Sequence, residues 1–167
     1  AGVGPRTVCG GALTWLGERA AMAAKGDKDV FGRYRSLDTL MVRLKALEAK
    51  IDEEVEAASP LSQHEEIPPE LREQWEEESK AAVMAEYRHR RAGFLTALQG
   101  WLRDVWLHAR GLGAERARFP DLTDSAATVA GRITAREAEV NLRLVEQTQR
   151  TLHTNVNELL VLEMGLL

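Results

Sequence analysis

The sequence predicts an all-α fold, a helical bundle that carries a long antiparallel helical hairpin. Apolar residues recur at steps of three and four between Leu37 and Val55, which places them on one face of a helix. Pro68-Pro69-Glu70 and a Thr134-x-x-Glu137 capping box mark two further helix starts. No stretch of the sequence alternates apolar and polar residues in the manner typical of a strand.

The N-terminal residues 1–11 are rich in glycine and poor in large apolar side chains, so we expect a flexible leading segment. Residues 12–167 are expected to form a single helical domain. Its first element is a short helix over about residues 12–25, ended by Lys25-Gly26-Asp27.

The first long helix is expected from Leu37 to about Glu56, with Glu and Lys on the face opposite the apolar one. It ends at Ser59-Pro60, because proline disfavours the helical conformation of its predecessor. The apolar face consists of residues 37, 40, 44, 47, 51 and 55.

The second long helix is expected from Pro68 to about Arg110, where Gly111 and Gly113 end it. Gly93 and Gly100 mark points of a kink or of close contact with another helix. Because about ten residues join the two helices, we expect residues 37–90 to form an antiparallel hairpin. The apolar stripe of the second helix is Leu71, Trp75, Val83, Tyr87, Phe94, Leu98, Trp101 and Val105.

The C-terminal part predicts three shorter helices. A helix of small residues is expected from Ser125 to Gly131, and a second begins at the capping box and ends near His153. Asn157 is expected to be the N-cap of a last helix, over residues 158–164. The second of these helices has Ala138, Leu142, Val145 and Leu152 on its apolar side, and the last is apolar on nearly every face.

Composition excludes several classes of protein. The 167 residues include 22 Lys and Arg against 26 Asp and Glu, a net charge of −4, which argues against nonspecific coating of nucleic acid. A single cysteine, Cys9, allows no internal disulfide and fits a reducing cytoplasm. No apolar run suits a membrane span or a secretory signal. The charge is uneven, with −6 over residues 1–78 and +2 over residues 79–167.

One pair of residues in the sequence has the spacing of a metal-binding motif. Glu86 and His89 have the Glu-x-x-His spacing of a di-iron bundle, but no second copy exists and arginines flank it, so a solvated face is favoured. Neither a phosphate-binding loop nor a dinucleotide fingerprint is present. We therefore expect no catalytic residue, metal or cofactor in this chain. Contact of DNA with Arg88–Arg91, or with Arg136, Arg143 and Arg150, stays open, and a solvated face balanced by Glu139 and Glu146 is favoured for the latter.

The two tryptophans of the second helix, Trp101 and Trp106, are five positions apart and are expected to point to different sides. Arg103 and Asp104 are adjacent, so each is expected to find its partner on a different element rather than in the other.

Residues of the second half resemble a known family. The stretch from Phe94 to Leu107, which includes Trp101-Leu-Arg103-Asp104-Val105, is followed by Phe119-Pro-Asp121. The closing helices read Val140-Asn-Leu-Arg-Leu-Val145 and, after a run containing Asn155 and Asn157, Leu159-Leu160-Val-Leu-Glu163. Together, residues 90–167 resemble the C-terminal domain of the delta-prime subunit of the bacterial DNA polymerase III clamp loader. Thr154 and Glu158 depart from that family's pattern, which has a basic residue and proline there.

The resemblance implies a post-ATPase oligomerisation domain, the collar, in which this helical bundle packs beside those of sister subunits. It implies a non-enzymatic module with other clamp-loader subunits as partners, DNA contacted weakly or indirectly, and a cytoplasmic location. The expected partner-facing residues are Trp106, Leu159, Leu160 and Leu162, and Asn155 and Asn157 act as caps. The region 37–90 is unlike the family and is expected to be an elaboration. The alternatives are a free-standing helical adaptor that uses the hairpin as its binding surface, and a di-iron or other bundle enzyme.

Overall fold

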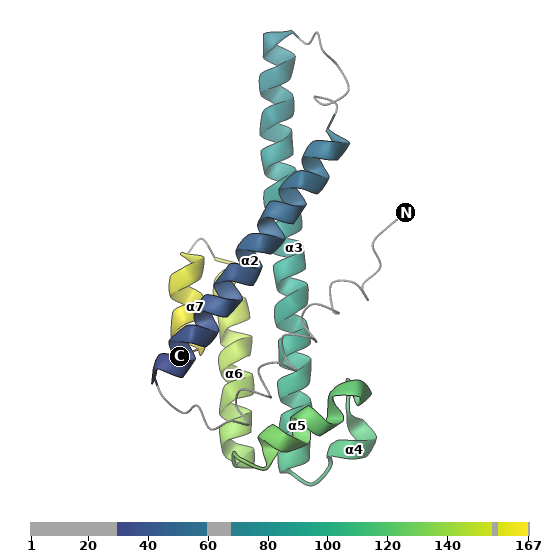
Figure 1. Cartoon of the computed structure of the whole chain (residues 1–167), viewed down its shortest axis with the longest axis vertical. Coiled ribbons are helices and arrows are strands. Elements are labelled where there is room, and N and C mark those ends of the chain that lie inside the picture. Colours follow the sequence, from purple (N-terminus) through teal and green to yellow (C-terminus); the bar gives the residue numbers. More distant parts are fainter. Residues whose placement is uncertain (1–29, 60–67, 155–156, 167) are drawn as a thin grey trace. The chain divides into compact units, whose positions relative to one another are not determined.

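A computed structural model describes residues 30–59, 68–154 and 157–166, and every regular element among them is helical. The all-α prediction is therefore confirmed for these residues. The elements follow one another along the chain as shown in Figure 1. They are α2 (Val30–Ala58), α3 (Pro69–Ala109), α4 (Gly113–Arg116), η2 (Pro120–Leu122), α5 (Thr123–Ala130), α6 (Ala135–Leu152) and α7 (Glu158–Leu166).

The chain divides into two compact units. One comprises residues 39–91 and the other comprises residues 1–38 and 92–167. Helix α3 is continuous from the first unit into the second. We call them the hairpin unit and the bundle unit. The short helix expected over residues 12–25 and the leading segment 1–11 lie outside the described residues.

The hairpin unit holds the C-terminal part of α2 and the N-terminal part of α3. Helix α2 begins at Val30, seven residues before the predicted start, and ends one residue before Ser59, as the Ser59-Pro60 pair indicated. Helix α3 begins at Pro69, one residue after the predicted start. The described core of this unit consists of Leu40, Leu44, Ile51 and Tyr87. Residues 60–67, which join the helices, lie outside the described part, so the hairpin connection stays a prediction.

Helix α3 ends at Ala109, just before Gly111 and Gly113, the glycines that predicted its end. Gly111 has a φ of 75°, the left-handed conformation that glycine adopts without a steric penalty. The N–H of Gly111 donates to the carbonyl of His108, and the N–H of Leu112 donates to that of Leu107. These bonds satisfy carbonyls that a helix end leaves without an intrahelical partner.

The bundle unit contains the C-terminal part of α3 together with α5, α6 and α7, and each of these helices contributes buried apolar side chains. Helix α7 packs against α6, and the two are drawn side by side in Figure 1. Gly165 permits this approach, because a Cβ at that position would overlap the Thr148 hydroxyl. The core residues are Leu95, Ala97, Leu98, Trp101, Val105 and Leu107 of α3, Ala126 of α5, Ala138, Val145 and Leu152 of α6, and Val161 and Leu162 of α7.

Candidate functional site

The capping box that predicted the start of α6 is present. The Thr134 hydroxyl accepts a hydrogen bond from the Glu137 N–H at 3.2 Å, and a Glu137 carboxylate oxygen accepts one from the Thr134 N–H at 2.7 Å. Asn157 caps α7, since its Oδ1 accepts from the Leu160 N–H at 3.3 Å. Asn155, the other predicted cap, lies outside the described residues. These side chains satisfy helix-end amides and thus serve the fold.

Helix α7 carries three of the four residues predicted to face a partner, and the structure separates them. Leu159 and Leu160 are 48% and 50% exposed, as a partner-facing position requires. Leu162 is 0% exposed, so it is a core residue and its assignment to the interface is wrong. Positions 160 and 162 lie about 200° apart around a helix, so both cannot face outward when the helix packs on a neighbour.

The exposed apolar surface extends beyond the predicted residues. Met164 is 78% exposed and follows Leu160 by one helical turn. On α6, Val140 and Leu144 are also exposed and lie one turn apart. We call Leu159, Leu160 and Met164 the α7 apolar face. The uniformly apolar sequence of α7 indicated that some side chains would stay uncovered, but only the packing on α6 selects which.

Trp101 and Trp106 occupy different environments, as their spacing predicted. Trp101 is buried, and its Nε1–H donates to Ser125 Oγ at 3.2 Å. Trp106 is half-buried, and the guanidinium of Arg110 lies 5.5 Å from the centre of its ring. The Trp106 Nε1 has no hydrogen-bond acceptor among the described residues. A partner-facing role for Trp106 stays a prediction.

Asp104 anchors the segment that follows α4. It is 1% exposed, and its two carboxylate oxygens accept the N–H groups of Arg118 and Phe119 at 3.0 and 2.9 Å. Gly100, one turn earlier on α3, allows this segment to approach, since a Cβ there would lie 3.0 Å from both side chains. The element that approaches Gly100 closely is therefore a non-helical segment and not the helix that was predicted. This approach brings two backbone donors to a buried carboxylate.

Arg103 and Asp104 were expected to have separate partners, and this is correct only in part. The Arg103 guanidinium donates to the carbonyl of Arg116 at 3.3 Å, which is a partner on another element. The same Nη1 also lies 3.3 Å from Asp104 Oδ1. Adjacent side chains leave a helix in different directions, but arginine is long enough to turn back to its neighbour.

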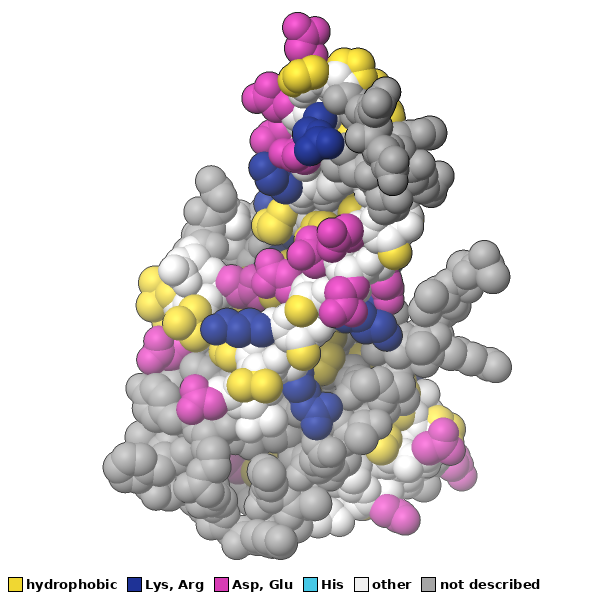
Figure 2. All heavy atoms as spheres, turned by 45° about the horizontal axis from the view of Figure 1, so that its top comes forward, with side chains coloured by type: hydrophobic (Ala, Val, Ile, Leu, Met, Phe, Trp, Pro, Cys, Tyr) yellow, Lys and Arg dark blue, Asp and Glu magenta, His cyan; other side chains and the backbone are white. Residues whose placement is uncertain are grey.

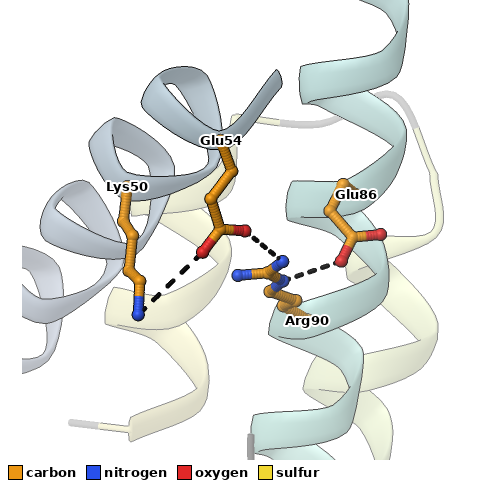
Figure 3. Close-up of polar contacts among 4 residues, drawn as sticks. All are labelled: Lys50, Glu54, Glu86 and Arg90. Atoms are coloured by element: carbon orange, nitrogen blue, oxygen red, sulfur yellow. Dashed lines mark hydrogen bonds and ion pairs between the residues drawn. The ribbon is translucent and has the colours of Figure 1, made fainter. Parts of the chain in front are cut away.

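Arg90 is the centre of a polar cluster in the hairpin unit (Figure 3). Its Nη2 lies 2.6 Å from Glu54 Oε2 on α2, and its Nε lies 2.7 Å from Glu86 Oε1 one turn earlier on α3. Hydrogen bonding by Glu54, followed by that of Glu86, raises the pKa of Arg90, and hydrogen bonding by Arg90 lowers the pKa of Glu54. Lys50 lies 3.9 Å from the other Glu54 oxygen. The cluster links the two helices of this unit.

The Arg90 cluster includes Glu86 of the Glu86-x-x-His89 motif. Glu86 is engaged by a guanidinium, and His89 is exposed. The described ranges contain no group of three or more His, Cys, Asp or Glu residues that could hold a metal ion.

Two of the three arginines of α6 are balanced by neighbouring acids, in line with the favoured interpretation for these two. Arg143 pairs with Glu139, and Arg150 pairs with Glu146 at 3.1 Å. Both pairs have the i, i+4 spacing that brings side chains together on a helix. This face of α6 is a solvated, internally compensated surface.

No described helix is both long enough and apolar enough to cross a membrane. Comparison of the chain with protein-family models, with curated proteins and with solved structures found no match.

Proposed function

We propose that this chain is a non-catalytic assembly module, the collar domain of a delta-prime-type subunit of a DNA polymerase III clamp loader. In this role it holds a replication ATPase complex together through its helical bundle, and its partners are sister subunits. The α7 apolar face carries the proposal. A nine-residue helix that is almost wholly apolar buries Val161 and Leu162 and leaves Leu159, Leu160 and Met164 in solvent.

Burying such a face against another protein is favourable at roughly 25 cal/mol per Å² of apolar surface removed from water. A fully buried leucine contributes about 2 kcal/mol on this scale, so a face of three large side chains suits the centre of an interface. The resemblance of residues 90–167 to the collar domain indicates which proteins would bind this face, namely sister subunits of a clamp loader. The resemblance rests on sequence motifs and the exposed face on packing, and the two share Leu159 and Leu160.

The test is assembly with the other clamp-loader subunits, measured by size-exclusion chromatography with light scattering. The full-length protein that contains this chain should enter a complex, and Leu160→Asp should abolish entry, because a charge in an apolar interface is left without a partner. Val42→Asp is the matched control, since Val42 is an exposed apolar residue (67%) on α2 in the hairpin unit. It should assemble as the parent protein does.

Circular dichroism separates loss of assembly from loss of folding. Leu160→Asp should retain its helix content, because half of that side chain is already in water. Failure of the unmodified full-length protein to associate with the other subunits would refute the proposal. Finding that the gene encodes an ATPase core upstream of Ala1 would support the clamp-loader assignment. The alternative, a free-standing adaptor, requires that the hairpin unit bind a partner while the α7 apolar face does not.

A further inference from the structure

The hairpin unit contains a groove that the collar proposal does not use. It has a volume of about 520 Å³ and lies between the C-terminal part of α2 and the part of α3 from Trp75 to Arg90. All of the described residues that line it belong to the hairpin unit. The groove is open to solvent along one side and has an apolar floor with charged edges.

The floor is formed by apolar side chains that the two helices do not fully cover. Ile51 is completely buried beneath it, and Val55 and Trp75 are half-buried. Ala58 and Ala82 line the same hollow and are too small to fill it. A large aromatic side chain beside small neighbours is a common setting for a binding residue, because it offers apolar area without losing much conformational freedom.

The edges of the groove are acidic. Glu54, Glu78 and Glu86 line it, and its cation Arg90 already pairs with Glu54 and Glu86. Glu78 accepts a hydrogen bond from the neutral amide of Gln74 at 2.8 Å, which leaves its charge available to a cation.

The surroundings reinforce this charge. Residues 46–86 hold 13 acidic and 3 basic side chains, a net charge of −10, whereas the whole chain carries −4. In Figure 2, Asp and Glu side chains gather over α2 and over the first turns of α3.

These properties select the kind of ligand. Phosphate groups of nucleic acids or anionic lipids are repelled by such a field. The apolar floor requires an apolar ligand surface, and the acidic edges require cations beside it. An amphipathic helix whose apolar face carries leucine-like side chains, flanked by Lys and Arg, has both the apolar surface and the cations. Such helices bind in apolar grooves.

We propose that this groove binds a basic amphipathic helix of a partner protein. The apolar stripe contacts Trp75 and Val55, and the flanking cations pair with Glu78 and with the acidic edge. The occupant is a protein segment, and the hairpin unit thereby recruits a partner distinct from the subunits that contact α7.

The probe is a fluorescein-labelled 18-residue peptide of leucine and lysine with the 3.6-residue period of an amphipathic helix. Two comparison peptides isolate the requirements: one replaces every lysine with glutamate, and one scrambles the leucine–lysine order. Fluorescence anisotropy with the 167-residue chain should show saturable binding of the first peptide. The glutamate and scrambled peptides should each bind at least about tenfold more weakly, because each removes one of the two complementary features.

Variants locate the binding in the groove. Glu78→Lys and Trp75→Ala should each weaken the leucine–lysine peptide by about tenfold, through like-charge repulsion and loss of apolar contact, respectively. Glu73→Lys is the matched control, because it makes the same charge change on the opposite face of α3, about 140° away around the helix. It should alter affinity by less than about threefold, as a distant screened charge does.

Two results would overturn the proposal. Equal weakening by Glu73→Lys and Glu78→Lys would mean that the acidic field alone attracts the peptide, with no docking in the groove. Self-association of the chain that Glu78→Lys or Trp75→Ala abolishes would mean that a second copy occupies the groove. Neither result bears on the α7 apolar face, so the collar proposal and this one fail separately.

Discussion

Asp104 shows how one side chain can hold a segment without regular structure. Residues 117–119 belong to no helix, and the N–H groups of two of them are satisfied by the Asp104 carboxylate. A buried carboxylate is costly unless it is hydrogen-bonded, and a buried N–H is costly unless it has an acceptor. Each therefore stabilises the other, and Gly100 supplies the space in which they meet.

Asp104→Asn should lower the free energy of unfolding by about 2–3 kcal/mol. The amide retains the shape of the carboxylate, but its NH₂ group cannot accept the hydrogen bond that one oxygen now accepts, so a buried donor is left unsatisfied. Urea unfolding monitored by circular dichroism measures the change. Asp121→Asn, at an exposed site, should change stability by less than about 0.5 kcal/mol. Equal stability of the two variants would show that the Asp104 bonds contribute little.

Helix α6 shows which properties of an element follow from its own sequence. Its start is determined by the capping box and its solvated face by Glu–Arg pairs at i, i+4, and both are local. Its contact with α7 is not local. It depends on Gly165, whose lack of a side chain leaves room for the Thr148 hydroxyl, which itself donates to the Leu144 carbonyl at 2.8 Å.

Gly165→Ala should destabilise the bundle unit by about 1–2 kcal/mol. Alanine gains about 1 kcal/mol in helix propensity over glycine, but overlap with Thr148 costs more than that gain. Thr148→Ala in the same chain should cancel most of the loss, because the overlapping hydroxyl is removed. Thermal unfolding of the four proteins of this double-mutant cycle measures the coupling.

Gly131→Ala is the control for this cycle. A Cβ at Gly131 would meet its nearest neighbours, two backbone carbonyl oxygens, at 3.6 and 3.7 Å, which are ordinary contacts. The backbone there is right-handed, with a φ of −67°, so alanine fits without strain. This variant should be as stable as the parent or slightly more stable. A loss at Gly131 as large as that at Gly165 would contradict the overlap argument.

At the scale of the whole molecule, charge is divided along the chain. The net −10 of residues 46–86 leaves +6 for the remaining residues. Like charges one helical turn apart, such as Glu73 and Glu77, repel one another, whereas the contacts of Arg90 with Glu54 and Glu86 attract. Because acids far outnumber bases in this region, we expect repulsion to dominate there.

Raising the sodium chloride concentration from about 20 mM to 300 mM should therefore increase the protection of backbone amides in residues 69–86. The Debye length falls well below the spacing of distant charges over this range, so repulsion between exposed acids is screened. Hydrogen–deuterium exchange with mass spectrometry measures the protection. The double substitution Glu73→Gln and Glu77→Gln should reduce the salt effect. Lower protection at high salt would mean that the ion pairs outweigh the repulsion.

Much of the helical architecture followed from the sequence. The bounds of α3 and the caps of α6 and α7 lie at or within a residue of the predicted positions, because proline, glycine and capping side chains act on the backbone next to them. The earlier start of α2 and the short elements α4 and η2 were missed. Four-residue and three-residue helices are too short to show a periodic pattern.

The α7 apolar face and the groove beside Trp75 were harder to predict from the sequence. Leu159, Leu160 and Leu162 are equivalent in type, and the sequence of α7 marks no face as inner or outer. The groove beside Trp75 joins residues of two helices, and no motif in either one indicates it.

By itself, the sequence determined where the main helices lie and what charge each part of the chain carries, because helix signals act over a few residues and charge follows directly from composition. Only the tertiary structure decided that Leu162 is core while Leu160 is exposed, that Asp104 holds the Arg118–Phe119 backbone, and that Arg90 joins Glu54 to Glu86. The physical reason is that burial depends on which side chains from distant parts of the chain arrive at the same place.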